Sequence, residues 1–134
     1  MEAQASPSSN NSNNNGFVDF SLPASHPFYL HPSNNPGTRL VHISFNGSDF
    51  VIWRKSMFIS LSKKNKLGLI IDRVSPPSPS SPYYPYWERY NDMVIAWITN
   101  SLSRDIATSL LSFNTAREIW IDINERFGQS DDSK

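Results

Sequence analysis

A run of prolines divides this chain and limits what can form on either side of it. Within residues 75–85, the ten residues PPSPSSPYYP contain five prolines. Proline fixes φ and has no N–H donor, so neither a helix nor a central strand can pass through such a run. Residues 75–85 are therefore predicted to form a proline-rich loop between two packed parts of the chain.

The start of the chain is poor in the side chains that build a core. Residues 1–25 are dominated by Ser, Asn and Pro, with few large apolar groups. Burial of so few groups cannot offset the entropy that is lost when a backbone becomes ordered. We therefore expect a disordered tail over residues 1–25 and one domain over residues 26–134, a length that can bury a core of its own.

Residues 27–47, between this tail and the first helical pattern, are expected to form an irregular arm that lies on the body. Pro32 and Pro36 discourage a helix there. Residues 40–45 have the apolar content of a short strand, which the turn signal at Gly47 would end.

A helix is predicted over residues 49–64. Ser48 is placed to cap its first turn. Apolar side chains recur there at three- and four-residue steps and gather on one stripe: Phe50, Trp53, Met57 and Leu61, widened by Val51 and Phe58. The lysines of the last turn, with Gly68 shortly beyond them, are typical of a helix C-terminus.

Three more helices are predicted within residues 86–128. The first covers residues 86–102 and carries a second apolar stripe, made of Trp87, Tyr90, Val94, Trp97 and Ile98. A short helix over residues 104–112 follows, with Ser103 as its cap and with three side chains turned inward: Ile106, Leu110 and Leu111.

The last helix has the clearest start signal. Thr115 and Glu118 form a capping box, in which a hydroxyl and a carboxylate each satisfy a free backbone N–H group. Its apolar face is made of Ile119, Trp120, Ile123 and Phe127. Gly128 is expected to end this helix in a left-handed conformation.

Together these patterns predict an all-α fold, a compact domain of about four helices. Each of the four tryptophans lies on the apolar stripe of a helix, where such rings normally supply buried area. We therefore interpret them as core anchors: Trp53, Trp87, Trp97 and Trp120. Stacking of these rings on nucleic-acid bases is the alternative.

Charge is unevenly distributed although the formal net charge is zero. Residues 48–73 carry six basic residues against two acidic ones, whereas residues 74–134 carry five against eight. A candidate patch for nucleic acid or for another copy of the chain consists of Arg54, Lys55, Lys63, Lys64 and Lys66. The alternative is a solvated helix end, since cations favourably meet a helix C-terminus.

No residue pattern points to catalysis. The chain has no cysteine, which excludes disulfides and thiolate metal sites. Its histidines, His26, His31 and His42, lack the spacing of metal ligands. We expect no enzymatic activity, no catalytic residues, no metal or cofactor and no small-molecule substrate. No apolar run approaches the ~20 residues of a membrane-spanning helix, and no secretory signal is evident, so a cytoplasmic protein without a membrane partner is expected.

Two blocks of sequence resemble a known family. FYLHPSNNPG precedes FNGSDFVIWRKSMFISLSKKNKLGLIID, and NDMVIAWITNSLS with AREIWIDINERFGQS follows. The first block resembles the amino-terminal gag segment of plant copia-type retrotransposon polyproteins at these positions: Tyr29, Leu30, His31, Pro32, Ser33, Asn35, Pro36, Gly37, Gly47, Trp53, Met57, Leu61, Lys64, Asn65, Lys66, Leu67 and Gly68. The second block, from Trp87 to Gln129, resembles the gag portion that follows in those polyproteins.

The resemblance implies a structural role. Gag domains of these elements assemble into particles that enclose element RNA, so the expected partners are other copies of the chain or gag-like proteins, with weak non-specific RNA contact. Because the chain stops at Lys134, where a complete gag would continue, we expect a truncated or domesticated form.

A second interpretation remains open at this point. The proline-rich loop or the arm would serve an adaptor module as a peptide ligand or a groove, with Tyr83, Tyr84 and Tyr86 adding aromatic contact. Self-association and adaptor binding predict different partners for the same chain.

Overall fold

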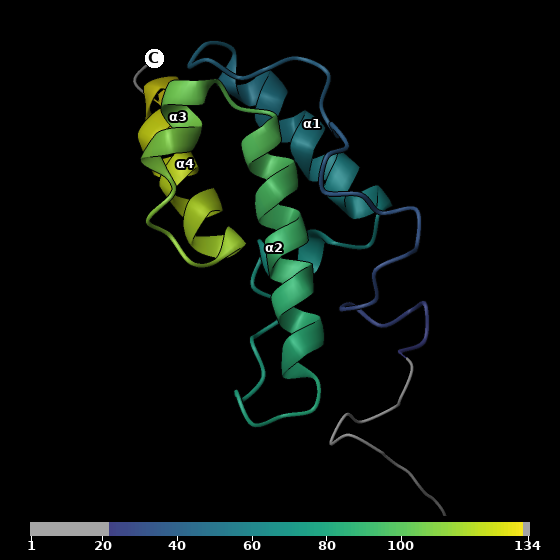
Figure 1. Cartoon of the computed structure of the whole chain (residues 1–134). Helices are drawn as coiled ribbons and strands as arrows, with labels where there is room; N and C mark the ends of the chain where they lie inside the picture. The colour runs from purple at the N-terminus through teal and green to yellow at the C-terminus, as the bar shows by residue number, and fades with distance from the viewer. Residues whose placement is uncertain (1–21, 133–134) are drawn as a thin grey trace, which may run out of the picture.

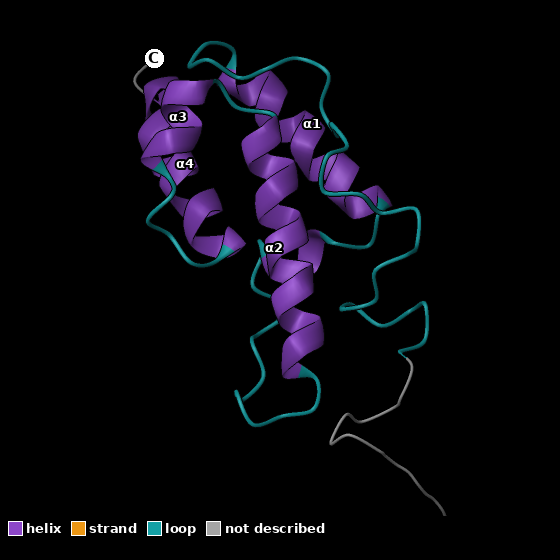
Figure 2. Cartoon of the chain, in the orientation of Figure 1, coloured by secondary structure: helices purple, strands orange, loops and turns teal. Residues whose placement is uncertain are grey.

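The computed structural model describes residues 22–132, and side chains as far as residue 128. Its elements are α1 (Phe50–Lys63), the short 3-10 helix η2 (Leu67–Leu69), α2 (Tyr84–Asn100), α3 (Arg104–Ser109) and α4 (Ala116–Asp132). The described part of the chain contains helices joined by loops and no strand (Figure 2), which confirms the predicted all-α fold. The tail expected over residues 1–25 lies almost wholly outside the described residues.

Helix α2 is central to the arrangement. It runs between α1 on one side and the pair α3 and α4 on the other, and the arm passes along the side that carries α1 (Figure 1). Helices α1 and α4 also contact each other beside α2, and η2 packs against α1. One core can therefore collect the apolar stripes of all three long helices.

That core contains the tryptophan rings. Trp53 is 3% exposed and its ring lies 5.8 Å from that of Trp120, which joins α1 to α4. On α2, Trp97 is completely buried and Trp87 is nearly so. The remaining fully buried large side chains include Met57, Leu61, Tyr90, Ile98 and Ile123. Truncation of a buried Leu or Met to Ala typically costs about 2–5 kcal/mol, so these contacts determine the fold.

The start of α1 differs from the prediction. Asp49, not Ser48, occupies the N-cap position, in a left-handed conformation with φ of 59°, and no side-chain hydrogen bond caps the helix. Val51 does not widen the buried stripe, because 57% of it is exposed. The four side chains at the core of the predicted stripe, Phe50, Trp53, Met57 and Leu61, are all buried.

The end of α1 is a Schellman motif built on asparagine, not on the predicted glycine. Asn65 has φ of 59°, its N–H donates to the Ser62 carbonyl, and the N–H of Lys66 donates to the Leu61 carbonyl at 2.8 Å. Asparagine tolerates this conformation better than most residues. Gly68 has another reason to be small, since a Cβ there would lie 2.8 Å from the Val74 side chain.

The predicted strand over residues 40–45 does not form. Only Phe45 pairs, in an isolated parallel bridge to Leu102: its N–H donates to the Ser101 carbonyl and its carbonyl accepts from Ser103 N–H, both at 2.7 Å. A strand needs a neighbour along its whole length, and here the neighbouring segment continues into α3 after Ser103.

Helix α2 lies two residues earlier than predicted, and helix α3 is shorter than predicted. Helix α2 begins at Tyr84, so Pro85 lies in its first turn, where the missing N–H costs nothing. It ends at Asn100, before the bridge to Phe45. Helix α3 ends three residues earlier than predicted, and Leu111, which was expected inside, is 76% exposed.

The capping box at the start of α4 is confirmed. Thr115 Oγ1 accepts the N–H of Glu118 and Glu118 Oε1 accepts the N–H of Thr115, each at 3.1 Å. The predicted stop at Gly128 is wrong, because α4 continues to Asp132. At Gly128 an added Cβ would come within 3.6 Å of the Phe50 ring, so this glycine lies against the start of α1.

Candidate functional site

The arm is held to α2 through two of its own carbonyl groups. The indole N–H of Trp97 donates to the Asn35 carbonyl at 2.8 Å, and the side-chain amide of Asn100 donates to the Pro36 carbonyl at 2.6 Å. Trp97 is completely buried, and a buried donor without a partner is costly. The position of the arm is therefore coupled to the core.

Residues 31–34 of the arm form a compact turn. The His31 N–H donates to Asn34 Oδ1 and the Asn34 N–H donates to the His31 carbonyl, both at 2.8 Å. His31 Nδ1 lies 2.8 Å from Ser33 Oγ and accepts the Ser33 N–H at 3.1 Å. Because Nδ1 is an acceptor here, neutral His31 carries its proton on Nε2.

A pocket of about 310 Å³ lies between this turn and the end of α1. The arm contributes Tyr29, Ser33 and other polar groups, and the end of α1 contributes the lysines. The residues used below line it together: His31, Ser33, Asn34, Lys63, Lys64 and Lys66. Two separate parts of the sequence thus meet in one polar concavity.

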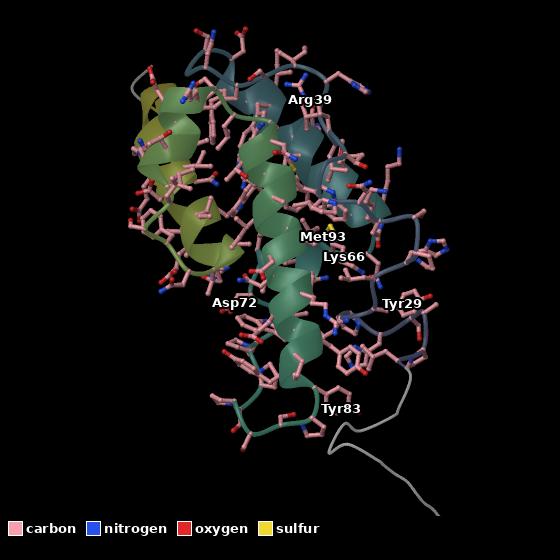
Figure 3. The ribbon with its side chains drawn as sticks, viewed as in Figure 1. Tyr29, Arg39, Lys66, Asp72, Tyr83 and Met93 are labelled. Carbon is pink, nitrogen blue, oxygen red and sulfur yellow. The ribbon has the colours of Figure 1, made fainter. Side chains whose placement is uncertain are left out.

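Lys66 is the unusual member of this pocket. Its residue is only 3% exposed, and it lies between α2 and the arm near Tyr29 (Figure 3). Its ammonium group is 5.7 Å from the centre of the Tyr90 ring and donates one long hydrogen bond, 3.4 Å, to the Asn65 carbonyl. Burial lowers the pKa of Lys66 from its ordinary value, and the nearby charge of Lys64 adds to the effect.

Tyr90 forms the floor beneath Lys66. Its hydroxyl accepts the Leu69 N–H at 3.0 Å and donates to the Lys66 carbonyl at 3.3 Å. Burial raises the pKa of Tyr90 to about 12, with the Leu69 hydrogen bond opposing that change. The phenol therefore stays neutral at physiological pH and fixes the backbone of η2 against α2.

The five cations of the predicted patch do not share one surface. Arg54 turns toward α4, where its Nε donates to Asn124 Oδ1 at 2.6 Å and its guanidinium lies 5.5 Å from the Trp120 ring. Lys64 lies half-buried over the Trp97 ring at 5.7 Å. Lys55 and Lys63 are exposed, whereas Lys66 is buried. The five cations thus differ in exposure and in their neighbours, and a contact of this region with nucleic acid or with another copy of the chain stays a prediction.

The outer face of α1 carries an unusual row of side chains. Ile52, Lys55, Ile59 and Lys63 follow one another at three- and four-residue steps, which places them on one face of the helix. Ile52 is 60% and Ile59 48% exposed. We call these four residues the basic row. Beside it, a groove of about 220 Å³ separates α1 from residues 41–49 and is lined by Ile43, itself 71% exposed.

The outer face of α4 carries the opposite charge. Glu118, Ile121 and Glu125 are all exposed, and their spacing places them on one face of that helix. We call these three residues the acidic row. Ile121 is 39% exposed, so this row also offers an apolar centre flanked by charge.

The tyrosines near the proline-rich loop lie against the body. The Tyr83 ring stacks on His26, with centroids 5.5 Å apart, and the Tyr84 ring lies 5.7 Å from that of Trp87. Tyr86 lies 5.8 Å from the guanidinium of Arg89. Each of these rings thus has a neighbour within the molecule, and Tyr83 is also 40% exposed.

Other classes of site find little support in the described residues. Within residues 22–132, no group of three or more His, Cys, Asp or Glu side chains is placed to hold a metal ion. No helix in this range is both long and apolar enough to cross a membrane.

The sequence signal that could have placed Lys66 inside is its position after Asn65. In a Schellman motif the residue after the left-handed one turns back toward the helix and contacts the residue five positions earlier. Here that residue is Leu61, which is fully buried. Treating the three lysines of residues 63–66 as one helix end overlooked this reversal of the chain.

Comparison with known proteins bears on this same region. Residues 31–78 match the family model described as the gag polypeptide of LTR copia-type elements. The match spans most of the arm, all of α1 and η2, and hence the turn, the lysines of the pocket and the basic row. No curated protein and no solved structure matches the chain. The predicted resemblance to the gag polypeptide of copia-type retrotransposons is confirmed over the matched residues.

Proposed function

We propose that this chain is a non-enzymatic structural module that associates with further copies of itself in the manner of a capsid protein. The observation that carries the proposal is the presence of the basic row on α1 and the acidic row on α4 of the same molecule. Each row has an exposed isoleucine centre and charges of a single sign. The family match supports a gag-like role for the segment that contains the basic row.

The chemistry of the two rows favours a head-to-tail contact. Two basic rows would repel each other, as would two acidic rows, whereas a basic row facing an acidic row brings opposite charges together around apolar side chains. Because such a contact joins different faces of the two copies, it leaves one row free on each copy. Contacts of this kind propagate into rings or open arrays.

Self-association of the unaltered chain is the first prediction. We expect the mass measured by analytical ultracentrifugation to rise with protein concentration, and the rise to weaken with added salt because exposed charges are screened. A mass that stays monomeric at the highest attainable concentration would overturn the proposed function.

Substitutions test whether the two rows make the contact. Ile52→Ser combined with Ile59→Ser is expected to weaken association by about tenfold or more, since burial of apolar area supplies most of the free energy. Leu111→Ser is the matched control. Leu111 has the size of an isoleucine, is 76% exposed and lies outside both rows. Equal weakening by both changes would argue against the rows.

Charge reversal provides the sharper version of this experiment. Lys55→Glu and Glu125→Lys should each weaken association when either variant is alone, since like charges then face each other. An equimolar mixture of the two variants should recover it, because opposite charges meet again at every contact. Failure of the mixture to recover, with the unaltered chain still associating, would reject the paired rows and leave self-association itself standing.

A further inference from the structure

Lys66 is a buried cation that lacks an anionic partner. Among the described residues its ammonium group forms no ion pair, and its one hydrogen bond is the 3.4 Å contact to the Asn65 carbonyl. An ammonium group has three donors, so two remain without a protein acceptor. A buried charge in this situation is expensive unless something compensates it.

The surroundings of Lys66 suit an anion and no other class of ligand. Lys63 and Lys64 line the same pocket, and no Asp or Glu side chain lines it. Repulsion between Lys64 and Lys66 destabilises the charged form of Lys66, and a bound anion would offset that repulsion. A cation or an apolar ligand would leave the charge of Lys66 uncompensated.

The turn of the arm adds neutral donors on the opposite wall. The Ser33 hydroxyl donates to His31 Nδ1, and the amide of Asn34 keeps its two N–H donors because its oxygen accepts from the His31 N–H. His31 presents Nε2–H, since its Nδ1 accepts from Ser33. Hydrogen bonds within residues 31–34 hold these groups in place before any ligand arrives, which lowers the cost of binding.

We propose that this pocket binds a phosphate group, with Lys66 as the buried cation, Lys63 and Lys64 at its rim, and residues 31–34 as the opposing wall. Three cations together with amide and imidazole donors match the several acceptor oxygens of a phosphate. The phosphate group belongs either to free phosphate or to the backbone of RNA. This site shares Lys63 with the basic row, but phosphate binding does not depend on the proposed self-association.

Inorganic phosphate is the first probe. Its addition is expected to raise the melting temperature of the protein more than sodium chloride at equal ionic strength, because binding to the folded state alone stabilises it. In two-dimensional amide NMR spectra, the phosphate-dependent shifts should concentrate on residues 31–34 and 63–66. Shifts spread evenly over all exposed lysines, or an effect equal to that of chloride, would overturn the proposal.

Lys66→Met provides the decisive variant. It keeps the length of the buried side chain and removes the charge, and it is expected to weaken phosphate binding by about tenfold or more. Arg104→Met is the matched control, because Arg104 is exposed on α3, outside the pocket and outside both rows. A Lys66→Met protein that folds and binds phosphate as tightly as the control would reject the site.

A second variant keeps the test decisive if Lys66→Met does not fold. Ser33→Ala combined with Lys63→Gln alters two exposed side chains of the pocket and leaves the core intact. This double variant is expected to lose several-fold in phosphate affinity. Unchanged affinity in a folded double variant would count against the proposal as strongly as the first result.

A labelled single-stranded RNA oligonucleotide distinguishes the two sources of the phosphate group. If the backbone of RNA occupies the pocket, inorganic phosphate will compete with the oligonucleotide and Lys66→Met will weaken its binding. If free phosphate is the ligand, Lys66→Met will abolish the response to phosphate and leave oligonucleotide binding as it is in the Arg104→Met control. Either result supports the pocket. A Lys66→Met protein that keeps both the response to phosphate and the binding of the oligonucleotide would reject it.

Discussion

At the scale of single residues, one lysine behaves unlike its neighbours. Lys63, Lys64 and Lys66 lie within four positions of one another, yet the first is exposed, the second covers an indole ring and the third is buried. The difference follows from the backbone, since the left-handed Asn65 reverses the chain and directs the next side chain inward. The free energy of folding therefore includes the cost of removing one ammonium group from water.

Replacement of Lys66 by methionine is expected to stabilise the folded protein at neutral pH. The gain should be about 1 kcal/mol or more, because a well-packed apolar side chain replaces an unpaired charge. Since the pKa of Lys66 is lowered in the folded state, its penalty is fully present below that lowered value and is relieved as the pH rises toward 10.5. The advantage of Lys66→Met should therefore shrink at alkaline pH.

Urea unfolding followed by tryptophan fluorescence measures this effect at neutral and alkaline pH. Lys63→Met serves as the control, because an exposed substitution usually changes stability by less than about 0.5 kcal/mol. A Lys66→Met variant that is less stable than the unaltered chain at neutral pH would mean that the ammonium group is satisfied in the fold.

At the scale of the elements, the helices differ in how their N-termini are stabilised. Helix α4 has a complete capping box, and Asn91 of α2 adds to it by accepting the Ala116 N–H at 2.9 Å. Helices α1 and α3 have no side-chain cap. These two helices depend on the packing of their apolar faces, as most helices in proteins do.

The capping residues should show this difference on substitution. Thr115→Ala is expected to lower the free energy of unfolding by about 1 kcal/mol, since it frees the Glu118 N–H. Ser103→Ala removes a residue of the same class at an N-cap position whose hydroxyl makes no capping bond, and its cost should be much smaller. Equal costs in urea unfolding experiments would show that the box contributes nothing specific.

Local patterns predicted the elements well because amphipathic spacing is itself a local property. The stripes of α1 and α2 and the box of α4 were read from residues close together in the sequence, and each is present in the structure. The errors at Ser48, Leu111 and Gly128 concern element ends, where tertiary contacts decide. Gly128, for instance, lies within α4 and close to Phe50, which is far away in the sequence.

The surfaces were harder to predict than the core for the same reason. The pocket requires residues 31–34 to meet residues 63–66, and the periodicity of neither segment specifies that meeting. The acidic row, by contrast, could have been read from the spacing of Glu118, Ile121 and Glu125 along one helix. The spacing alone does not show that this face of α4 stays exposed in the folded chain.

At the scale of the whole molecule, the arm and the helices form one unit. Trp97 connects them, because its ring lies in the core while its N–H reaches the arm. Trp87, on the same helix, is also buried, but its N–H has no hydrogen-bond partner among the described residues. Substitutions of these two tryptophans therefore distinguish the effect of the hydrogen bond from the effect of the buried ring.

Trp97→Phe is expected to loosen the arm as well as the core. It keeps a buried aromatic ring and removes the donor to Asn35, so amide hydrogen exchange over residues 27–47 should accelerate more than exchange in α4. Trp87→Phe should lower overall stability to a similar degree through its cavity but leave the exchange of the arm close to normal. Similar exchange patterns in both variants would show that the Trp97 hydrogen bond does not hold the arm in place.

The hydrogen bonds that hold the arm to α2 also determine which substitutions this junction tolerates. Trp97 and Asn100 donate hydrogen bonds to main-chain carbonyls, which every residue type possesses. The two bonds therefore do not depend on which side chains the arm carries at these positions. Mutational sensitivity at this junction should accordingly be one-sided. Substitution of Trp97 or Asn100 in α2 removes a hydrogen-bond donor. Substitution of Asn35 or Pro36 in the arm leaves the backbone carbonyl that accepts the bond in place.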